Sequence, residues 1–462
     1  MSERLNIYMS LLEEKPLYAD TIRLTAEKMD LSLQDKLYLC SFAPPIMEFA
    51  GWVLNEAVKS GKKRLYFLSR DGYQIYLAAC RLTELRKISI DCRYLYVSRY
   101  AMRIPSYHMD IPNCLNRICA RGMNVTLERI LKRGALTDEE AEEVAKLLGR
   151  EDRYRDVLKR HQISELKRTL GRQDDFLKYI EKHSTDEYEN TMGYLQQEGL
   201  LSDIPYAIVD SGWIGTLQQS LQVLIHSRMP NIRIEGYYFG LYEIPQEADI
   251  HDYHAWYFTP ATGLNRKVHF SNSLFEAICS TDEGMTIGYL KRGNRYLPQF
   301  DPAGNPNSEK IKRNLEIFKN FLGYYKEDTS ERRYIEGRKL AKKLFMKSMS
   351  RPAELEVGSF GEYLFSDDIL AGECQAVAAQ LTRKDIRDQH ILRRLYIMTR
   401  FTNENIRESA WIEGSIVKYG ISSGQRADSY YIRNNLRHVG WYKYLAYGRK
   451  QIRSFKAGKK QT

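Results

Sequence analysis

The segment from Pro205 to Gln222 constrains the fold of this chain more than any other part of the sequence. It begins with the apolar run Ala207–Val209, reaches Asp210, passes through a turn with two glycines, and continues from Thr216 with leucines at helical spacing. A short β-prone run followed by a glycine turn and an amphipathic segment is typical of one strand-loop-helix unit in a parallel sheet. The sequence therefore predicts an α/β fold with a ligand loop after this strand.

The predicted loop has the features of an anion site. Gly212 and Gly215 allow close backbone approach, and the free N–H groups that open the helix after Thr216 favour a negatively charged group, typically a phosphate. Asp210 would face the crevice in which open α/β sheets bind their ligands. We therefore expect a ligand that carries both a phosphate and hydroxyl groups.

Two earlier apolar runs also end in polar residues. The run Arg64–Leu68 is followed by Ser69, Arg70, Asp71 and Gly72, and the run from residue 94 to 97 is followed by Ser98, Arg99 and Arg103. Arginine forks suit phosphate oxygens, and a carboxylate suits sugar hydroxyls or a hydrated magnesium ion. Simpler readings stay open, because Asp-Gly is also a common turn and arginines often pair with surface acids.

The rest of the chain predicts a larger α/β domain followed by a helical region. We expect residues 1–290 to form the α/β domain, with a helical N-terminal part up to about residue 60 and a helical insertion at about 108–200. A further strand is expected at 232–242, and a turn-rich linker at 301–308. Residues 291–462 should form a mainly helical C-terminal region, with helices at 309–349 and 366–410.

Composition points to a cytoplasmic protein. No stretch approaches the roughly 20 apolar residues needed to span a bilayer, and the first residues lack the apolar core of a signal peptide. The seven cysteines are scattered and include no Cys-x-x-Cys pair, which argues against a structural zinc site and against a disulfide framework.

The net charge of +11 is concentrated near the C-terminus. After Asp428 there is no acidic residue, whereas nine lysines and arginines follow, interleaved with aromatic and aliphatic side chains. Such a segment suits an anionic membrane surface or a lipid-linked phosphate. We expect residues 430–460 to contact a membrane peripherally, with a plain solvated tail as the second interpretation and nucleic-acid binding as the third.

Four motifs carry a resemblance to a known family: Phe67–Gly72, Tyr96–Arg99, Val209–Gln218 and Leu274–Tyr289. Together they resemble the downstream half of bacterial polysaccharide-biosynthesis proteins labelled haloacid-dehalogenase-like hydrolases, over roughly residues 40–290. Those relatives commonly carry a phosphatase module with an Asp-x-Asp motif upstream of this region. That motif is absent here, so the resemblance does not imply a phosphatase activity, although the family is labelled hydrolase.

The same segments are similar, more loosely, to type I phosphoribosyltransferases. This resemblance implies an open, mostly parallel sheet of phosphoribosyltransferase-like (Rossmann-like) type, with Asp210 on the ribose hydroxyls. It assigns the 5-phosphate to Ser211, Gly212, Gly215 and Thr216, and pyrophosphate with its Mg²⁺ to Arg70, Asp71, Gly72, Arg99 and Arg103, beside Ser69 and Ser98. Asp71 and Asp210 would hold the metal through water. The chain departs from the family pattern in having Asp210-Ser211 in place of an acidic pair, and Trp213 in place of a smaller residue.

The implied reaction is transfer of a 5-phosphoribosyl group from phosphoribosyl pyrophosphate to a sugar hydroxyl of a growing, lipid-linked bacterial surface polysaccharide. A separate partner phosphatase would then remove the phosphate. A base near the acceptor hydroxyl would help, and Glu276, Asp282 and Glu283 are equal candidates. Two alternatives stay open: a sugar-phosphate hydrolase or phosphotransferase with Asp71 or Asp210 as nucleophile, and a non-catalytic basic scaffold.

Overall fold

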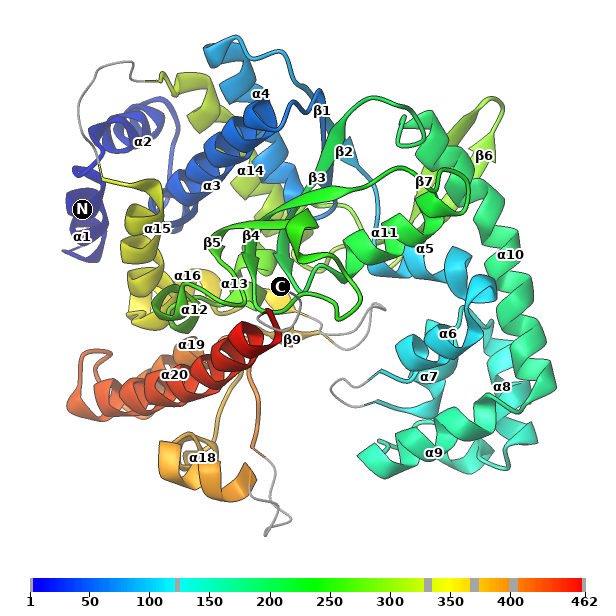
Figure 1. Cartoon of the computed structure of the whole chain (residues 1–462). Helices are drawn as coiled ribbons and strands as arrows, with labels where there is room; N and C mark the ends of the chain where they lie inside the picture. The colour runs from blue at the N-terminus through cyan, green and yellow to red at the C-terminus, as the bar shows by residue number, and fades with distance from the viewer. Residues whose placement is uncertain (1–2, 121–124, 328–334, 366–373, 399–405, 459–462) are drawn as a thin grey trace.

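The centre of the protein is a five-stranded, all-parallel sheet (Figure 1). In this computed structural model, residues 3–120, 125–327, 335–365, 374–398 and 406–458 are described, with side chains up to residue 454. The strands are β1 (Arg64–Leu68), β2 (Asp91–Leu95), β3 (Tyr206–Trp213), β4 (Glu235–Leu241) and β5 (Tyr253–Phe258), in the spatial order β2-β1-β3-β4-β5. The predicted α/β class and parallel sheet are confirmed.

Alternate side chains of the strands enter two different cores, which makes the sheet the middle of three layers. On β1, Leu65 and Phe67 pack into one core, while Tyr66 and Leu68 pack into the other. The first core contains α1 (Glu3–Leu12), α2 (Pro16–Lys28), α3 (Leu33–Lys59) and α4 (Gly72–Arg86), and the second contains α10 (Asp174–Gln197) and α11 (Thr216–His226). Both faces of the sheet are therefore covered, as a parallel sheet requires.

Helix α3 corrects one expectation from the sequence. Among the described residues it is the one helix long and apolar enough to cross a membrane by length and composition, with 89% of its most apolar window buried inside the protein. It starts with a capping box in which Ser32 and Asp35 exchange hydrogen bonds. The expectation that no such stretch exists was wrong, because two prolines and several polar residues hid the apolar character of this core helix.

Between β2 and β3, where the sequence predicts a helical insertion, the described chain forms helices. After α5 (Arg99–Arg103) and the short helix η1 (Ile104–Met109), the insertion comprises α6 (Ile111–Ile118), α7 (Leu127–Arg133), α8 (Asp138–Leu147), η2 (Glu151–Arg153), α9 (Arg160–Leu170) and α10. These helices have their own core, which includes Leu131, Val144 and Phe176. Figure 1 shows α6 to α9 gathered beside the sheet, with α10 running back toward it. The insertion therefore forms a separate lobe.

The boundary expected at residue 290 falls inside a β-hairpin, formed by β6 (Thr286–Arg292) and β7 (Arg295–Phe300). The expectation that helical structure begins at 291 is therefore wrong for the first ten residues of that region. The two-residue Gly293-Asn294 turn, a common hairpin connection, explains why. Beyond it, Phe345 and Trp411 belong to the same core as Phe49 and Phe239, so the chain on both sides of residue 290 is packed together.

Most of the C-terminal region is helical. Its elements after β7 are α14 (Ser308–Tyr324), α15 (Gly337–Phe345), η4 (Met346–Ser350), α16 (Glu354–Phe360), β8 (Leu364–Phe365), β9 (Gln375–Ala376), α17 (Arg383–Asp388), α18 (Ile391–Met398), α19 (Ile412–Ser422) and α20 (Tyr430–Gly458). The helix expected at 366–410 is broken into β9, α17 and α18, while its parts at 366–373 and 399–405, like residues 328–334 and 459–462, lie outside the described residues.

Candidate functional site

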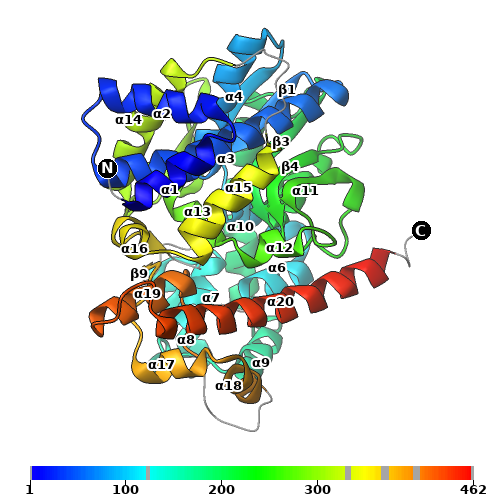
Figure 2. The ribbon, with the colours of Figure 1, turned by 90° about the vertical axis from the view of Figure 1, so that its left-hand side faces the viewer.

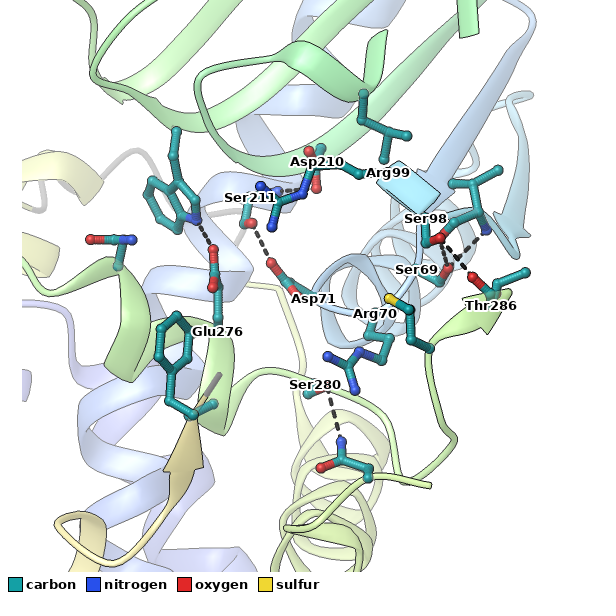
Figure 3. A pocket seen from close by; sticks show the side chains of 18 of the residues that line it. Ser69, Arg70, Asp71, Ser98, Arg99, Asp210, Ser211, Glu276, Ser280 and Thr286 are labelled. Carbon is teal, nitrogen blue, oxygen red and sulfur yellow. Dashed lines mark hydrogen bonds between the residues drawn. The ribbon is translucent and has the colours of Figure 1, made fainter. Parts of the chain in front are cut away.

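A cavity of about 350 Å³ lies at the carboxyl ends of β1 and β3 (Figure 3). From β1 the chain continues to β2 on one side, and after the insertion it returns as β3 on the other side. Open α/β sheets bind ligands at such a topological switch point. Of the residues expected from sequence, the lining includes Ser69, Arg70, Asp71, Ser98, Arg99, Asp210, Ser211, Gly212, Trp213, Gly215, Thr216 and Glu276.

The loop after β1 is fixed to the end of β2. The Ser69 hydroxyl donates to the Val97 carbonyl at 2.6 Å and accepts from the Val97 N–H at 2.9 Å. The Ser98 hydroxyl caps α5 and donates to the Thr286 carbonyl at 2.6 Å. These serines therefore hold the loops around the cavity in place, which leaves Arg70 and Asp71 to face the ligand space (Figure 3).

Strand β3 is longer than the sequence indicates. The first residues of the turn expected after Asp210 are still strand, because β3 stays paired with β4 as far as Trp213 opposite Leu241. Gly212 has φ +110°, and a Cβ atom there would lie 2.4 Å from the Gly240 carbonyl oxygen. Glycine at this position thus allows two strands to remain paired while β3 turns toward the cavity.

Hydrogen bonds connect the ends of β1 and β3. The Ser211 hydroxyl donates to Asp71 Oδ2 at 2.5 Å, and the Ser211 N–H donates to Asp210 Oδ1 at 2.9 Å. Trp213 has φ +79°, unusual for a residue other than glycine, and its indole N–H donates to Glu276 on α13 (Asn272–Ile278). Asp71, Asp210 and Glu276 consequently lie around one space (Figure 3).

The three carboxyl groups hold protons more tightly than ordinary carboxyl groups. Burial, together with the charge of Asp71, raises the pKa of Asp210 to about 8 and that of Glu276 to about 8. Burial also raises the pKa of Asp71. Three acids in a confined space disfavour each other's ionisation, so the ligand-free site retains protons at neutral pH. A bound cation would favour the ionised forms and release these protons.

Positive charge faces the carboxyl groups from two directions. Arg70 and Arg99 line the cavity, and neither guanidinium makes an ion pair or hydrogen bond with the described part of the chain. Helix α11 begins at Thr216 after Gly215, which has φ +73°, and no side chain caps its first N–H groups. Free N–H groups at a helix start attract anions. The cavity thus combines an anion site with a cluster of acids.

Four of the expected site residues do not line the cavity. Gly72 is the first residue of α4 and packs against Phe67 of β1. Arg103 lies behind the rim, where its guanidinium donates to Thr216 Oγ1 at 3.4 Å, and burial and the charge of Arg99 lower its pKa to about 10. Asp282 and Glu283 follow α13, and Glu283 accepts a hydrogen bond from the Tyr96 hydroxyl at 3.4 Å.

One wall of the cavity was missed by the sequence analysis. It includes Asn272, Ser280, Thr286, Asn305, Asn307, Leu364 and Phe365. Asn305 donates to the Thr281 carbonyl at 2.6 Å, and Asn307 exchanges two hydrogen bonds of 2.8 Å with the backbone of Leu364. The predicted linker therefore folds back as part of the site. The Gly293-Asn294 turn was the signal that could have revealed the hairpin leading into it.

The oxygen atoms of the site suit a magnesium ion that a ligand helps to hold. No group of three or more His, Cys, Asp or Glu residues in the described ranges is arranged to bind a metal by itself. Mg²⁺ commonly takes only one or two carboxylates, with waters and substrate phosphates completing its shell. Asp71 and Asp210 could serve in this way, so magnesium stays a prediction that depends on a phosphate-bearing ligand.

The raised pKa values predict that the ligand-free protein becomes less stable as pH rises. The folded state holds the Asp210 and Glu276 protons up to about pH 8, whereas an unfolded chain releases such protons near about pH 4. The folded state therefore binds more protons in between, and the free energy of unfolding falls from about pH 5 to about pH 8, by at most about 1.4 kcal/mol per pH unit for each carboxyl group.

This slope can be measured by urea unfolding at several pH values. Asp210→Asn should flatten it, whereas Asp203→Asn, which changes an exposed carboxyl group, should leave it as in the wild type. A slope that Asp210→Asn leaves unchanged would contradict the raised pKa of this group.

Comparison with known proteins gives no relative from which the function of this site could be inferred, so the function is inferred from the geometry of the site. No protein-family model matches the chain, and no curated protein matches its sequence.

Proposed function

We propose that the protein transfers a 5-phosphoribosyl group from phosphoribosyl pyrophosphate to a sugar hydroxyl of a growing bacterial surface polysaccharide. The observation that carries this proposal is the combination of an uncapped helix start, free arginines and clustered acids in one switch-point cavity. The donor has matching parts: a 5-phosphate, ribose hydroxyls and a magnesium-bound pyrophosphate. The sequence resemblance to type I phosphoribosyltransferases supports the same assignment.

The 5-phosphate would bind at the start of α11. Ser211, Gly212, Gly215 and Thr216 line this end of the cavity, and the first N–H groups of α11 lack a side-chain cap. Arg103 stands behind Thr216 and adds positive charge. A phosphate in this position would receive backbone hydrogen bonds and favourable charge together.

The pyrophosphate would bind at the loop after β1. Arg70 and Arg99 have no ion-pair partner among the described residues and can form charge-assisted hydrogen bonds to its oxygens. Asp210, between the two anion sites, would accept hydrogen bonds from the ribose hydroxyls. When bound, Mg²⁺ would neutralise the leaving pyrophosphate, held through water by Asp71 and Asp210.

Glu276 is the strongest candidate for the base that activates the acceptor. In the reaction, the bond from ribose C1 to pyrophosphate breaks, a bond from C1 to the acceptor oxygen forms, and the acceptor proton passes to a base. A cation bound with the donor would favour the ionised form of Glu276, and its pKa of about 8 in the ligand-free site makes that carboxylate a strong enough base to accept a proton near neutral pH. Glu276 lines the cavity, whereas Asp282 and Glu283 do not. The wall of Asn305, Asn307 and Leu364 would receive the acceptor sugar.

The remaining expectations complete the proposal. The product would carry a 5-phosphate on a lipid-linked glycan, and a separate phosphatase would remove it, with the protein working in the cytoplasm at the inner membrane face.

The hydrolase alternative requires an ionised carboxylate nucleophile. The Asp-x-Asp motif of the haloacid-dehalogenase-like phosphatases is absent from the sequence, which counts against that role. A purely structural scaffold would not explain why Arg70 and Arg99 line the cavity without an ion-pair partner among the described residues.

The assignment is tested by measuring the affinities for pyrophosphate and for ribose 5-phosphate, the two halves of the donor, separately. Arg99→Ala should weaken binding of magnesium pyrophosphate about tenfold or more, since hydrogen bonds to charged groups contribute about 1.5–3 kcal/mol, and should leave ribose 5-phosphate affinity nearly unchanged. Thr216→Val should do the opposite. Both affinities are measured by isothermal titration, with Arg295→Ala, an exposed arginine on β7, as the matched control.

The outcome separates the proposed function from its alternatives. A hydrolase of sugar phosphates would bind ribose 5-phosphate but show no site for pyrophosphate. Equal weakening of both ligands by Arg99→Ala would contradict the division of the cavity into two anion sites.

A further inference from the structure

Helix α20 is attached to the body of the protein by one of its faces. Lys443 forms an ion pair with Glu413 on α19 at 2.5 Å, and Lys450 forms one with Glu243 at 2.6 Å. The Tyr447 ring stacks on Tyr242 with centroids 5.3 Å apart. The lysines of this face are thus matched by acids of the body, and the helix is firmly docked.

The opposite face of α20 carries exposed basic and apolar side chains. It includes, at intervals of one to four residues, Tyr430, Arg433, Arg437, Trp441, Leu445, Arg449, Ile452 and Arg453. Trp441 is 51% exposed, Leu445 54% and Ile452 60%. Within the described residues, none of the four guanidinium groups makes an ion pair or hydrogen bond, and no acidic residue occurs after Asp428. The two faces therefore differ: bases facing the body are paired, and those facing outward are free.

Helix α18 extends the outward surface. Leu392 is 70% exposed and Met398 is 55% exposed, and Leu395 and Tyr396 are also exposed. The two helices are in contact, since the Tyr442 hydroxyl lies 3.4 Å from Met398 Sδ. Both views show α18 next to α20 at the lower side of the molecule, and Figure 2 shows the C-terminal part of α20 extending beyond its neighbours. We call this combined surface, the outward residues of α20 with the exposed residues of α18, the α18–α20 face.

We propose that the α18–α20 face docks on an anionic lipid surface, with α20 lying in the plane of the membrane. Arginines attract anionic headgroups, tryptophan and tyrosine favour the headgroup level, and aliphatic side chains favour the acyl boundary below it. The outward residues of α20 run from Tyr430 to Arg453, and this stretch offers about 36 Å of such contact at 1.5 Å per residue.

The composition of the face favours lipid over nucleic acid. Leu392, Leu445 and Ile452 cannot hydrogen-bond to phosphates or bases, and they lack the flat rings on which bases stack. Packing does not explain the exposure of Leu445 and Ile452 either, because α20 is already attached by its inner face. Burial in the acyl boundary would remove these side chains from water. This inference concerns a different surface from the cavity and does not rest on the proposed reaction.

Vesicle co-sedimentation of the full chain tests the proposal. We expect binding to vesicles with phosphatidylglycerol at least about tenfold stronger than binding to pure phosphatidylcholine, since each basic residue near an anionic surface adds about a fivefold gain. The double variant Leu445→Ser/Ile452→Ser should lose at least about tenfold in affinity because two buried aliphatic side chains are removed. The matched control is Leu147→Ser, which changes an exposed leucine of α8 and should bind like the wild type.

Trp441 provides a direct readout of contact with the lipid. Of the five tryptophans, Trp441 is the most exposed, so lipids brominated in their acyl chains should quench its fluorescence when vesicles are added. Trp441→Phe should abolish this quenching while binding persists. The proposal is overturned by equal binding to neutral and anionic vesicles, by unchanged binding of the double variant, or by absence of quenching in the wild type. Binding to RNA with no binding to vesicles would also overturn it.

Discussion

Replacement of Asp210 by asparagine is expected to weaken binding of magnesium-bound phosphoribosyl pyrophosphate by about 100-fold or more. In the proposed complex this carboxylate accepts hydrogen bonds from two ribose hydroxyls, and hydrogen bonds to charged groups contribute about 1.5–3 kcal/mol each. A loss of about 3 kcal/mol corresponds to a factor of more than 100 in affinity. The backbone N–H of Ser211, which now donates to Asp210, can equally donate to the amide oxygen of asparagine.

The same substitution should leave the fold intact. Burial raises the pKa of Asp210 to about 8, so the carboxyl group is costly to ionise in the ligand-free protein, and a neutral amide of the same shape avoids this cost. We expect the variant to be as stable as the wild type near pH 4 and more stable by a margin that grows as the pH rises to about 8. Isothermal titration gives the affinity, and urea unfolding gives the stability. Wild-type affinity in a folded Asp210→Asn protein would contradict the role of this residue.

Gly212→Ala is expected to reduce the free energy of unfolding by about 3 kcal/mol or more and to abolish donor binding. The new Cβ atom would lie 2.4 Å from the Gly240 carbonyl oxygen and 3.0 Å from the Tyr238 ring, at φ +110°. Backbone strain of this kind contributes about 1–3 kcal/mol, and overpacking contributes a further 1–3 kcal/mol or so. Strand β3 would have to separate from β4, which would displace Ser211 and Trp213 from the cavity.

A glycine without close neighbours separates these two contributions. Gly149 has φ +60° and no atom within 4 Å of a Cβ built on it. Gly149→Ala therefore introduces backbone strain alone, and we expect a loss of about 1 kcal/mol. Both free energies of unfolding are measured by urea unfolding. Equal losses for Gly212→Ala and Gly149→Ala would show that the close approach of β3 and β4 adds nothing to the destabilisation.

The central part of the fold could be predicted because local and long-range signals agree there. Apolar runs at 64–68 and 206–209 are followed by glycine turns and amphipathic helices, and such units form parallel sheets with a common carboxyl edge. Residues at the carboxyl ends of β1 and β3 therefore meet in one cavity, as Asp71 and Ser211 do at 2.5 Å. The continuation of β3 to Trp213 was not predictable, because it depends on pairing with β4 through a residue that lacks a Cβ atom.

The acceptor side of the site shows the limit of sequence analysis. Glu276, Asp282 and Glu283 are close in sequence and equal in chemistry, and only the position of α13 and the Trp213 indole bring Glu276 alone into the cavity. Asn305 and Asn307 lie in a turn-rich stretch that resembles any linker. Their place in the wall follows from hydrogen bonds to Thr281 and Leu364, which no local pattern reveals.

Titration of phosphoribosyl pyrophosphate into the wild-type protein tests the central proposal most directly. The titration is repeated without Mg²⁺, and ribose 5-phosphate and a nucleotide-sugar serve as control ligands. We expect magnesium-dependent binding of phosphoribosyl pyrophosphate, tighter than that of ribose 5-phosphate, with no comparable binding of the nucleotide-sugar. Absence of binding by the folded protein would contradict the phosphoribosyltransferase proposal and favour hydrolysis of sugar phosphates instead.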